Sequence, residues 1–180
     1  MKVALVVGHS KAKPGAVNQS TGITEYAFNS ALAKDIQQAL ASARNIETII
    51  ITRSTYAQLP RDINAINPTF IISLHCNAFN RKASGTETLY YKNSRKGEVI
   101  AKQLQKNIVD ALGLNDRGVI ARAESDRGGY LLHNTRAPAC IAEPFFIDND
   151  DDLRKAILNR EALINAFAQT IKDIKQCGIY

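Results

Sequence analysis

The sequence predicts an α/β fold in a single domain, with a mostly parallel, twisted β-sheet flanked by helices on both faces. Short runs of β-branched and aliphatic residues alternate along the chain with longer segments whose apolar residues recur every three or four positions. Strands that alternate with helices in this way are typical of a parallel sheet covered by helices. The length of 180 residues and a 45% share of hydrophobic residues suit one domain with a sizeable core.

The individual elements follow from local patterns of apolar residues. Short apolar runs rich in valine and isoleucine suit strands that are buried in a sheet. A four-residue spacing of apolar side chains, as from Phe28 to Leu40, places them on one face of a helix. These patterns predict strands at residues 2–7, 46–52, 69–78 and 85–91, and helices at 24–43, 58–67, 95–112 and 151–176.

The region between the last two predicted helices is less regular. Residues 115–129 are polar and contain several glycines, so we expect a binding loop or lid there. Residues 130–134 (YLLHN) and 137–146 (APACIAEPFF) predict two short strands. The last helix, from residue 151, begins among aspartates, whose charge the helix dipole favours at that end.

Charge and cysteine content narrow the function classes. Lys and Arg outnumber Asp and Glu by 23 to 17, and the net charge of +6 favours an anionic partner such as a cell wall. The basic residues lack interleaved aromatic residues, so we expect no nucleic-acid partner. No apolar run reaches the roughly 18 residues of a membrane span, so we expect no membrane insertion. Three cysteines without a Cys-x-x-Cys pair argue against a disulfide framework or a cysteine zinc cluster.

Four polar residues are expected to meet at one edge of the sheet. His9, His75 and Glu143 each follow a predicted strand, and open α/β sheets bind ligands outside the carboxyl ends of their strands. Glu25 lies in the first turn of the first helix and shares its apolar stripe, so it should face the sheet. Two histidines and a carboxylate make a zinc site with a fourth position open to water, and a second carboxylate can serve as general base.

Each of these residues also has a structural alternative. A histidine at a strand end is more often a hydrogen-bonded structural residue than a ligand, and a glutamate in a first helical turn can simply complement the dipole. Cys76 directly follows His75, but neighbours on a strand face opposite ways, which argues against a thiol nucleophile at the same site. His133 has no evident link to the cluster and is treated as structural or as a substrate contact.

Several segments together resemble the zinc-dependent N-acetylmuramoyl-L-alanine amidases of the amidase-3 family. In chain order they are VVGHSKAKPGA, ITEYAFN, SLHCNA, GTETLYY, DRGV and PACIAEPFFIDN, and they are spread over nearly the whole chain. The VGHS form is similar to that of phage endolysins. Many members of the family carry an aspartate two residues before the glycine of this motif, where this chain has Val6.

The resemblance implies a ligand set, a catalytic base and a substrate. Zinc would be held by His9, Glu25 and His75, and Glu143 would be the catalytic base. Members of the family cleave the amide between the lactyl group of N-acetylmuramic acid and L-alanine, the first residue of the peptidoglycan stem peptide, and so degrade the bacterial cell wall.

Asn77 and Arg117 are expected to hold carbonyl and carboxylate groups of the substrate, since the planar guanidinium of arginine binds carboxylates bidentately.

Residues 1–180 should form one catalytic domain, without a separate cell-wall-binding domain, and act as a monomer on peptidoglycan. The N-terminal apolar run is too short for a signal peptide, so a lysin made in the host cytoplasm is expected.

Two alternatives remain at this point. A carboxypeptidase-like zinc hydrolase usually takes two ligands from a His-x-x-Glu motif, whereas Ala12 stands three residues after His9. A non-catalytic peptidoglycan-binding domain would have a degenerate site, whereas all the residues expected of the enzyme are present.

Overall fold

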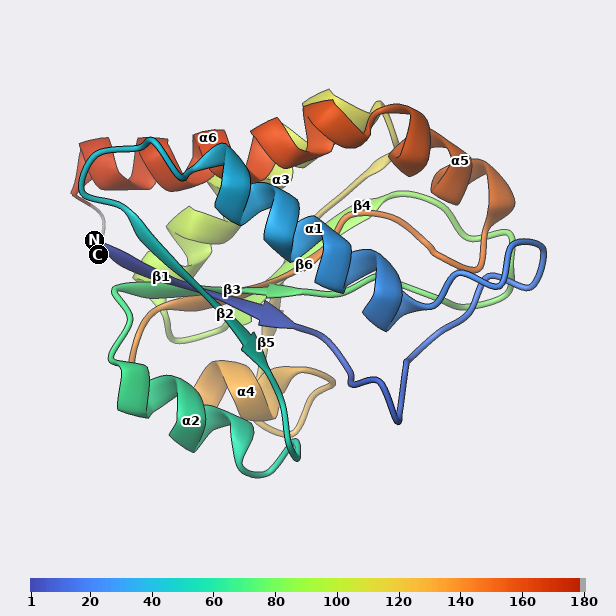
Figure 1. Cartoon of the computed structure of the whole chain (residues 1–180). Coiled ribbons are helices and arrows are strands. Elements are labelled where there is room, and N and C mark those ends of the chain that lie inside the picture. The colour runs from blue at the N-terminus through green and yellow to red at the C-terminus, as the bar shows by residue number, and fades with distance from the viewer. Residues whose placement is uncertain (179–180) are drawn as a thin grey trace.

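The computed structural model describes residues 1–178 and shows one six-stranded sheet (Figure 1). The strand order is β2-β1-β3-β6-β4-β5. The strands are β1 (Lys2–Val7), β2 (Glu47–Thr52), β3 (Phe70–Leu74), β4 (Thr86–Tyr91), β5 (Asp116–Arg122) and β6 (Ala139–Glu143).

The sheet is parallel except at one pair of strands. β1 lies between β2 and β3, and β3 is followed by β6, with all of these pairs parallel. β4 runs antiparallel to β6 and parallel to β5. β6 is therefore the last strand in the sequence but occupies a central position, joining the two halves of the sheet. The predicted α/β fold with a mostly parallel sheet is confirmed.

Helices cover both faces of the sheet, as predicted (Figure 1). α1, α3 and α6 pack on one face, with α5 leading into α6, and α2 and α4 pack on the other. The helices are α1 (Glu25–Ala39), α2 (Leu59–Ile66), α3 (Arg95–Leu112), α4 (Gly129–Asn134), α5 (Asp150–Leu158) and α6 (Arg160–Cys177).

The two faces have separate hydrophobic cores of unequal size. Alternate residues of a strand point to opposite faces, so Ile72 of β3 enters the core under α1, α3 and α6, and Ile71 enters the core under α2 and α4. The larger core includes Phe28 of α1 and Phe167 of α6, both almost completely buried. The smaller core is formed by a few aliphatic residues of the short helices and the strands.

The structure corrects three details of the predicted elements. The expected loop at 115–129 contains strand β5, a half-exposed edge strand whose polar residues face solvent. The expected strand at 130–134 lies within the short helix α4. The predicted last helix is broken at Asn159, whose non-helical backbone separates α5 from α6.

The cysteines and the apolar character of the helices bear on two predictions, that no disulfide framework forms and that no segment spans a membrane. All three cysteines are free, with Cys76 and Cys140 buried and Cys177 exposed. Among the helices of residues 1–178, none combines the length and apolar character needed to span a bilayer.

Candidate metal centre and active site

The carboxyl ends of three neighbouring parallel strands place the predicted site residues at one edge of the sheet. The backbone N–H of Gly8 donates to Leu74 O (2.9 Å), so β1 and β3 stay paired up to the residue before His9. The N–H of His75 donates to Ala142 O (3.0 Å), which aligns the end of β3 with the end of β6. Glu143 is the last residue of β6. The hydrogen-bond ladder itself therefore brings these three side chains together.

His9 leaves the sheet through an unusual backbone conformation. Its φ of 66° lies in the left-handed region, which non-glycine residues seldom adopt. The following turn is closed by paired backbone hydrogen bonds between Ser10 and Lys13 (3.1 and 3.0 Å). Strained backbone of this kind persists where the surrounding structure holds it, and it is concentrated at functional sites.

Gly15 allows the loop to pass close behind the site. A Cβ atom there would lie 2.6 Å from Oε2 of Glu25 and 2.7 Å from the His9 ring, and the φ of this residue is +80°. Only glycine fits both the space and the backbone angle. The segment that follows His9 is thus a wall of the site.

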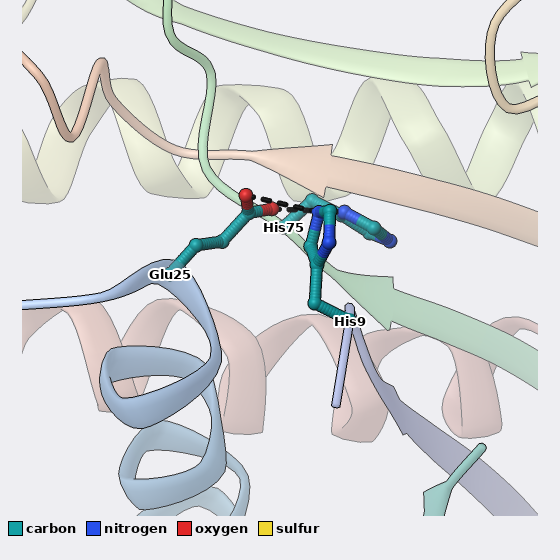
Figure 2. A group of neighbouring side chains, drawn as sticks. All are labelled: His9, Glu25 and His75. Carbon is teal, nitrogen blue, oxygen red and sulfur yellow. Dashed lines mark hydrogen bonds and ion pairs between the residues drawn. The ribbon is translucent and has the colours of Figure 1, made fainter. Parts of the chain in front are cut away.

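His9, Glu25 and His75 converge from three different elements (Figure 2). The Glu25 carboxylate contacts both imidazoles, with Oε2 3.0 Å from Nε2 of His9 and Oε1 3.0 Å from Nδ1 of His75. One ligand atom from each of the three residues lies within 4.8 Å of the others. Two imidazole nitrogens and one carboxylate oxygen form the donor set of catalytic zinc sites, so these residues fit a zinc ion.

Glu25 is strongly held in its charged form. Its side chain is almost completely buried, and burial by itself would raise the pKa of this carboxyl. Contacts with His75 and His9, together with the backbone N–H of Cys76 that donates to Oε1 (3.0 Å), outweigh burial and hold the pKa of Glu25 well below its usual range. Glu25 is therefore a preformed anion, as a metal ligand must be.

The Cys76 thiol is unsuited to act as a nucleophile. Sγ is buried and lies 3.6 Å from Nδ2 of Asn29, on the α1 side of the sheet. Burial, followed by the charges of Glu25 and Glu143, raises the pKa of this thiol well above its usual value. A reactive cysteine needs the opposite, a lowered pKa and access to solvent.

Glu143 is a second buried carboxylate beside the three converging residues. It is 2% exposed, and burial raises its pKa, an effect opposed by the charges of Arg127 and His75. Nη2 of Arg127 lies 3.3 Å from Oε1 of Glu143. Across the antiparallel pair, Glu143 is directly opposite Glu87 of β4, whose own carboxylate pairs with Nε of Arg117 at 2.7 Å.

A single cavity of about 460 Å³ joins these groups. His9, Glu25, His75 and Glu143 all line it. It continues over the α2 and α4 face of the sheet, where the side chains of Arg53, Tyr56 and Arg127 also line it. Arg127 lies in the segment 115–129 that was expected to be a binding loop. No sequence pattern pointed to Arg53 or Tyr56, which lie in the irregular segment between β2 and α2.

Asn77 and Arg117 lie outside the lining of this cavity. The N–H of Asn77 donates to Phe145 O (3.0 Å), its carbonyl accepts from Ile147 N (2.9 Å), and its side chain accepts from Ala78 N (3.1 Å). Arg117 binds Glu87 and lies over the Phe146 ring, with Cζ 5.0 Å from the ring centroid. Both residues thus have structural contacts, and their role in holding substrate stays a prediction.

The third histidine lies away from the cluster. Nδ1 of His133 is 3.2 Å from Glu124, and the His133 ring packs edge-on against Tyr91 with centroids 5.1 Å apart. His133 therefore has a local structural environment, and it does not line the cavity.

Comparison with known proteins establishes the family. The family described as "Amidase_3: N-acetylmuramoyl-L-alanine amidase" matches residues 3–174. The chain belongs to the Amidase_3 family. Val6, where many Amidase_3 members carry an aspartate, is completely buried in β1 and lies beside Ser73 of β3.

Relatives with similar sequences include named amidases of bacilli and a phage endolysin. The N-acetylmuramoyl-L-alanine amidase LytC of Bacillus subtilis is 27% identical over 92% of this chain, which spans 33% of LytC. The endolysin of Bacillus phage SPP1 is 29% identical over 93% of this chain, which spans 62% of that protein. A protein of Bacillus anthracis described as an uncharacterised cell wall amidase is 34% identical over 47% of this chain, which spans 16% of that protein.

Solved structures of an amidase and of an endolysin catalytic domain share the fold. An N-acetylmuramoyl-L-alanine amidase from Clostridium difficile 630 superimposes with a TM-score of 0.88 at 20% identity, covering 97% of this chain and 96% of that one. The catalytic domain of the CD27L endolysin, which targets Clostridia difficile, gives 0.81 at 24% identity, covering 96% of this chain and 97% of that one. The likeness confirms the arrangement of sheet and helices.

Proposed function

We propose that this protein is a zinc-dependent, endolysin-like peptidoglycan amidase that cleaves the amide between N-acetylmuramic acid and L-alanine. The observation that carries the proposal is the meeting of His9, Glu25 and His75 with the buried carboxylate of Glu143 in one cavity. Membership of the Amidase_3 family and the similarity to named amidases and an endolysin support it.

His9, Glu25 and His75 would hold the zinc ion. A zinc ion bound there supplies Lewis acidity, which polarises a carbonyl group and lowers the pKa of water toward about 7. The three residues contribute a preformed site, because Glu25 is anionic and Gly15 leaves the space that the carboxylate and the His9 ring occupy.

Glu143 would act as the general base and then as the general acid. Its carboxylate accepts the proton of the attacking water and delivers it to the amine of L-alanine as the C–N bond breaks. A pKa raised by burial suits this exchange, since a carboxyl that titrates closer to neutral pH can both accept and donate a proton. Arg127 holds the carboxylate in place while it is charged.

Replacing the proposed base tests the reaction directly. We expect Glu143→Gln to keep zinc and to lower the release of stem peptides from purified peptidoglycan by roughly 10²- to 10⁴-fold, the usual contribution of acid–base catalysis. Mass spectrometry of the digest identifies the bond that is cut, through new amino-terminal L-alanine. Glu124→Gln is the control, since Glu124 is exposed and pairs with His133 outside the cavity. Full activity of Glu143→Gln would contradict the role of this residue.

The histidines provide a matched test of the ligand set. We expect His9→Ala and His75→Ala to lose zinc, measured by metal analysis of the purified protein, while His133→Ala retains it. A chelator should silence the wild-type enzyme, and added zinc should restore it. Unchanged zinc content in both His9→Ala and His75→Ala would show that the ligand set is wrong.

The partner proposed for this chemistry is peptidoglycan, with the protein acting as a monomer on the bacterial cell wall. The net charge of +6 would favour anionic wall polymers, so binding to purified walls should weaken as salt concentration rises. Wall binding without the appearance of new amino groups would instead identify a non-catalytic wall-binding domain.

A further inference from the structure

The cavity extends well beyond the proposed zinc ligands, and one wall of that extension carries Tyr56 and Arg53. The Tyr56 ring lies against Tyr130 of α4, with centroids 5.5 Å apart. The guanidinium of Arg53 lies over the same Tyr56 ring, with Cζ 5.5 Å from its centroid. The Tyr130 hydroxyl donates to Ala57 O (3.1 Å) and so ties α4 to the segment before α2. This wall therefore holds Arg53 by packing on an aromatic ring.

Arg53 has no acidic partner within ion-pair distance in the part of the chain that the structure describes. The second cation of the cavity, Arg127, makes only long contacts of 3.3 and 3.5 Å with Glu143, and 62% of its side chain is exposed. A short arginine–carboxylate hydrogen bond is about 2.7–2.9 Å. Both guanidinium groups thus keep hydrogen-bond donors that a further anion can use.

The floor beneath these cations is apolar. It consists of the aliphatic side chains of Val6, Leu59, Leu89, Leu131 and Ile141. Beside Val6, the hydroxyl of Ser73 is completely buried and finds no hydrogen-bond partner within residues 1–178. An unpaired buried hydroxyl in a cavity wall is a donor and acceptor available to a ligand.

The shape of the cavity distinguishes the two parts of the proposed substrate. A glycan strand continues in both directions and needs a long open surface, whereas a stem peptide is a side branch that can enter a cavity between the sheet and the two short helices α2 and α4. Neighbouring residues of an extended peptide are about 3.5 Å apart, so the residue after L-alanine remains inside a cavity that begins at the scissile bond. Arg127 lies 3.3 Å from Glu143, and Arg53 lines the same cavity, so the residue after L-alanine enters a space that carries both cations.

We propose that this extension binds the stem peptide and that Arg53, with Arg127, selects a free carboxylate on the residue after L-alanine. The inference rests on the proposed amidase function and deepens it, because it names the acidic form of the peptide as the preferred substrate. An amide at the same position pairs less well with two guanidinium groups, since it offers one uncharged acceptor oxygen and an NH₂ group that arginine, which has only donors, cannot accept. Arg53 binds substrate at a distance from the reacting atoms.

Product inhibition provides the test. The dipeptides L-alanyl-D-glutamate and L-alanyl-D-isoglutamine differ in one group, a carboxylate in the first and an amide in the second. Each is added to wild-type zinc enzyme that is digesting purified peptidoglycan, and the inhibition constant is measured from the release of amino groups. We expect the carboxylate form to inhibit about tenfold more strongly, the size of one charge-assisted hydrogen bond.

Variants of Arg53 then show whether this residue causes the preference for the carboxylate dipeptide. We expect Arg53→Gln to remove the tenfold preference, Arg53→Lys to retain part of it, and Arg61→Gln, on the exposed face of α2, to leave it intact. Equal inhibition of the wild type by the two dipeptides, or no inhibition by either, would overturn the proposal. So would a preference that survives in Arg53→Gln.

These outcomes are separable from failure of the proposed function. If the wild type releases no amino groups from peptidoglycan, the amidase function itself is wrong. If it does release them and Glu143→Gln does not, while both dipeptides inhibit equally, the amidase function stands and only the role of Arg53 is refuted.

Discussion

The two faces of the sheet differ in how tightly they are packed. On the face covered by α1, α3 and α6, long helices bury a continuous core that includes Phe70, Phe145 and Phe167. On the face covered by α2 and α4, two short helices leave a cavity of about 460 Å³ with arginines in its wall. The site residues lie at the edge where these two faces meet.

The difference shows how one sheet can meet two conflicting requirements. Burial of apolar surface provides most of the free energy of folding, and it favours a face without voids. Substrate binding requires unfilled space and polar groups with unused hydrogen bonds, which lower stability. Here the larger core supplies the stability, so the opposite face can remain open.

The largest expected effect compares equivalent leucines on the two faces. Leu163 of α6 and Leu131 of α4 are both almost fully buried, but only Leu131 lines the cavity. We expect Leu163→Ala to lower the free energy of unfolding by about 3–4 kcal/mol and Leu131→Ala by about 2 kcal/mol, because the cost grows with the new void that is created. Urea denaturation measures both values, and equal losses would refute the difference in packing.

A second, smaller effect compares two glycines with positive φ. Gly15 (φ +80°) contacts the Glu25 carboxylate, whereas Gly22 (φ +73°) has open space around the position of a Cβ atom. Alanine strains the backbone in both, but only Gly15→Ala should displace the proposed ligands and weaken zinc binding, by roughly tenfold or more. Zinc titration in competition with a chelator measures this. Equal zinc affinity in the two variants would show that Gly15 does not shape the site.

The smallest expected effect concerns the stability contributed by Glu143. Burial raises its pKa in the folded state, so the ionised form favours unfolding, and stability falls as pH rises from the unfolded pKa through the folded one. Glu143→Gln should therefore be more stable than the wild type at pH 8, with a difference that shrinks toward pH 4. Urea denaturation of the metal-free proteins at both pH values measures it. A variant less stable than the wild type at pH 8 would contradict the pKa direction.

Much of the fold was predictable because local patterns and tertiary packing agree. The runs of β-branched and aliphatic residues form strands β1, β2 and β3, as predicted. The segments with a four-residue apolar spacing form helices α1 and α3. The errors lie where packing overrides local sequence. β5 is an edge strand held by pairing with β4, and α4 is a six-residue helix, too short to show a period. The break at Asn159 interrupts an otherwise continuous helical pattern.

Part of the candidate site was predictable for a topological reason. His9 and His75 follow strands β1 and β3, and Glu143 ends strand β6. Because neighbouring parallel strands end at the same edge of a sheet, their positions in the sequence predicted that these residues would meet. Arg53 and Arg127 lie in connecting segments, whose course depends on tertiary packing that no local pattern describes. Arg117 lies in the polar segment that was expected to be a loop, but it belongs to strand β5 and pairs with Glu87.

The central position of β6 has a consequence for how the chain can fold during synthesis. Until residues 139–143 are available, β4 and β5 have no strand that connects them to β1, β2 and β3. A ribosome-bound chain that stops short of this segment can form at most two separate fragments of sheet, with unpaired edges and without Glu143. The insertion of one late strand thus completes the sheet and the proposed catalytic apparatus in the same event, which links folding and the onset of activity in a single cooperative step.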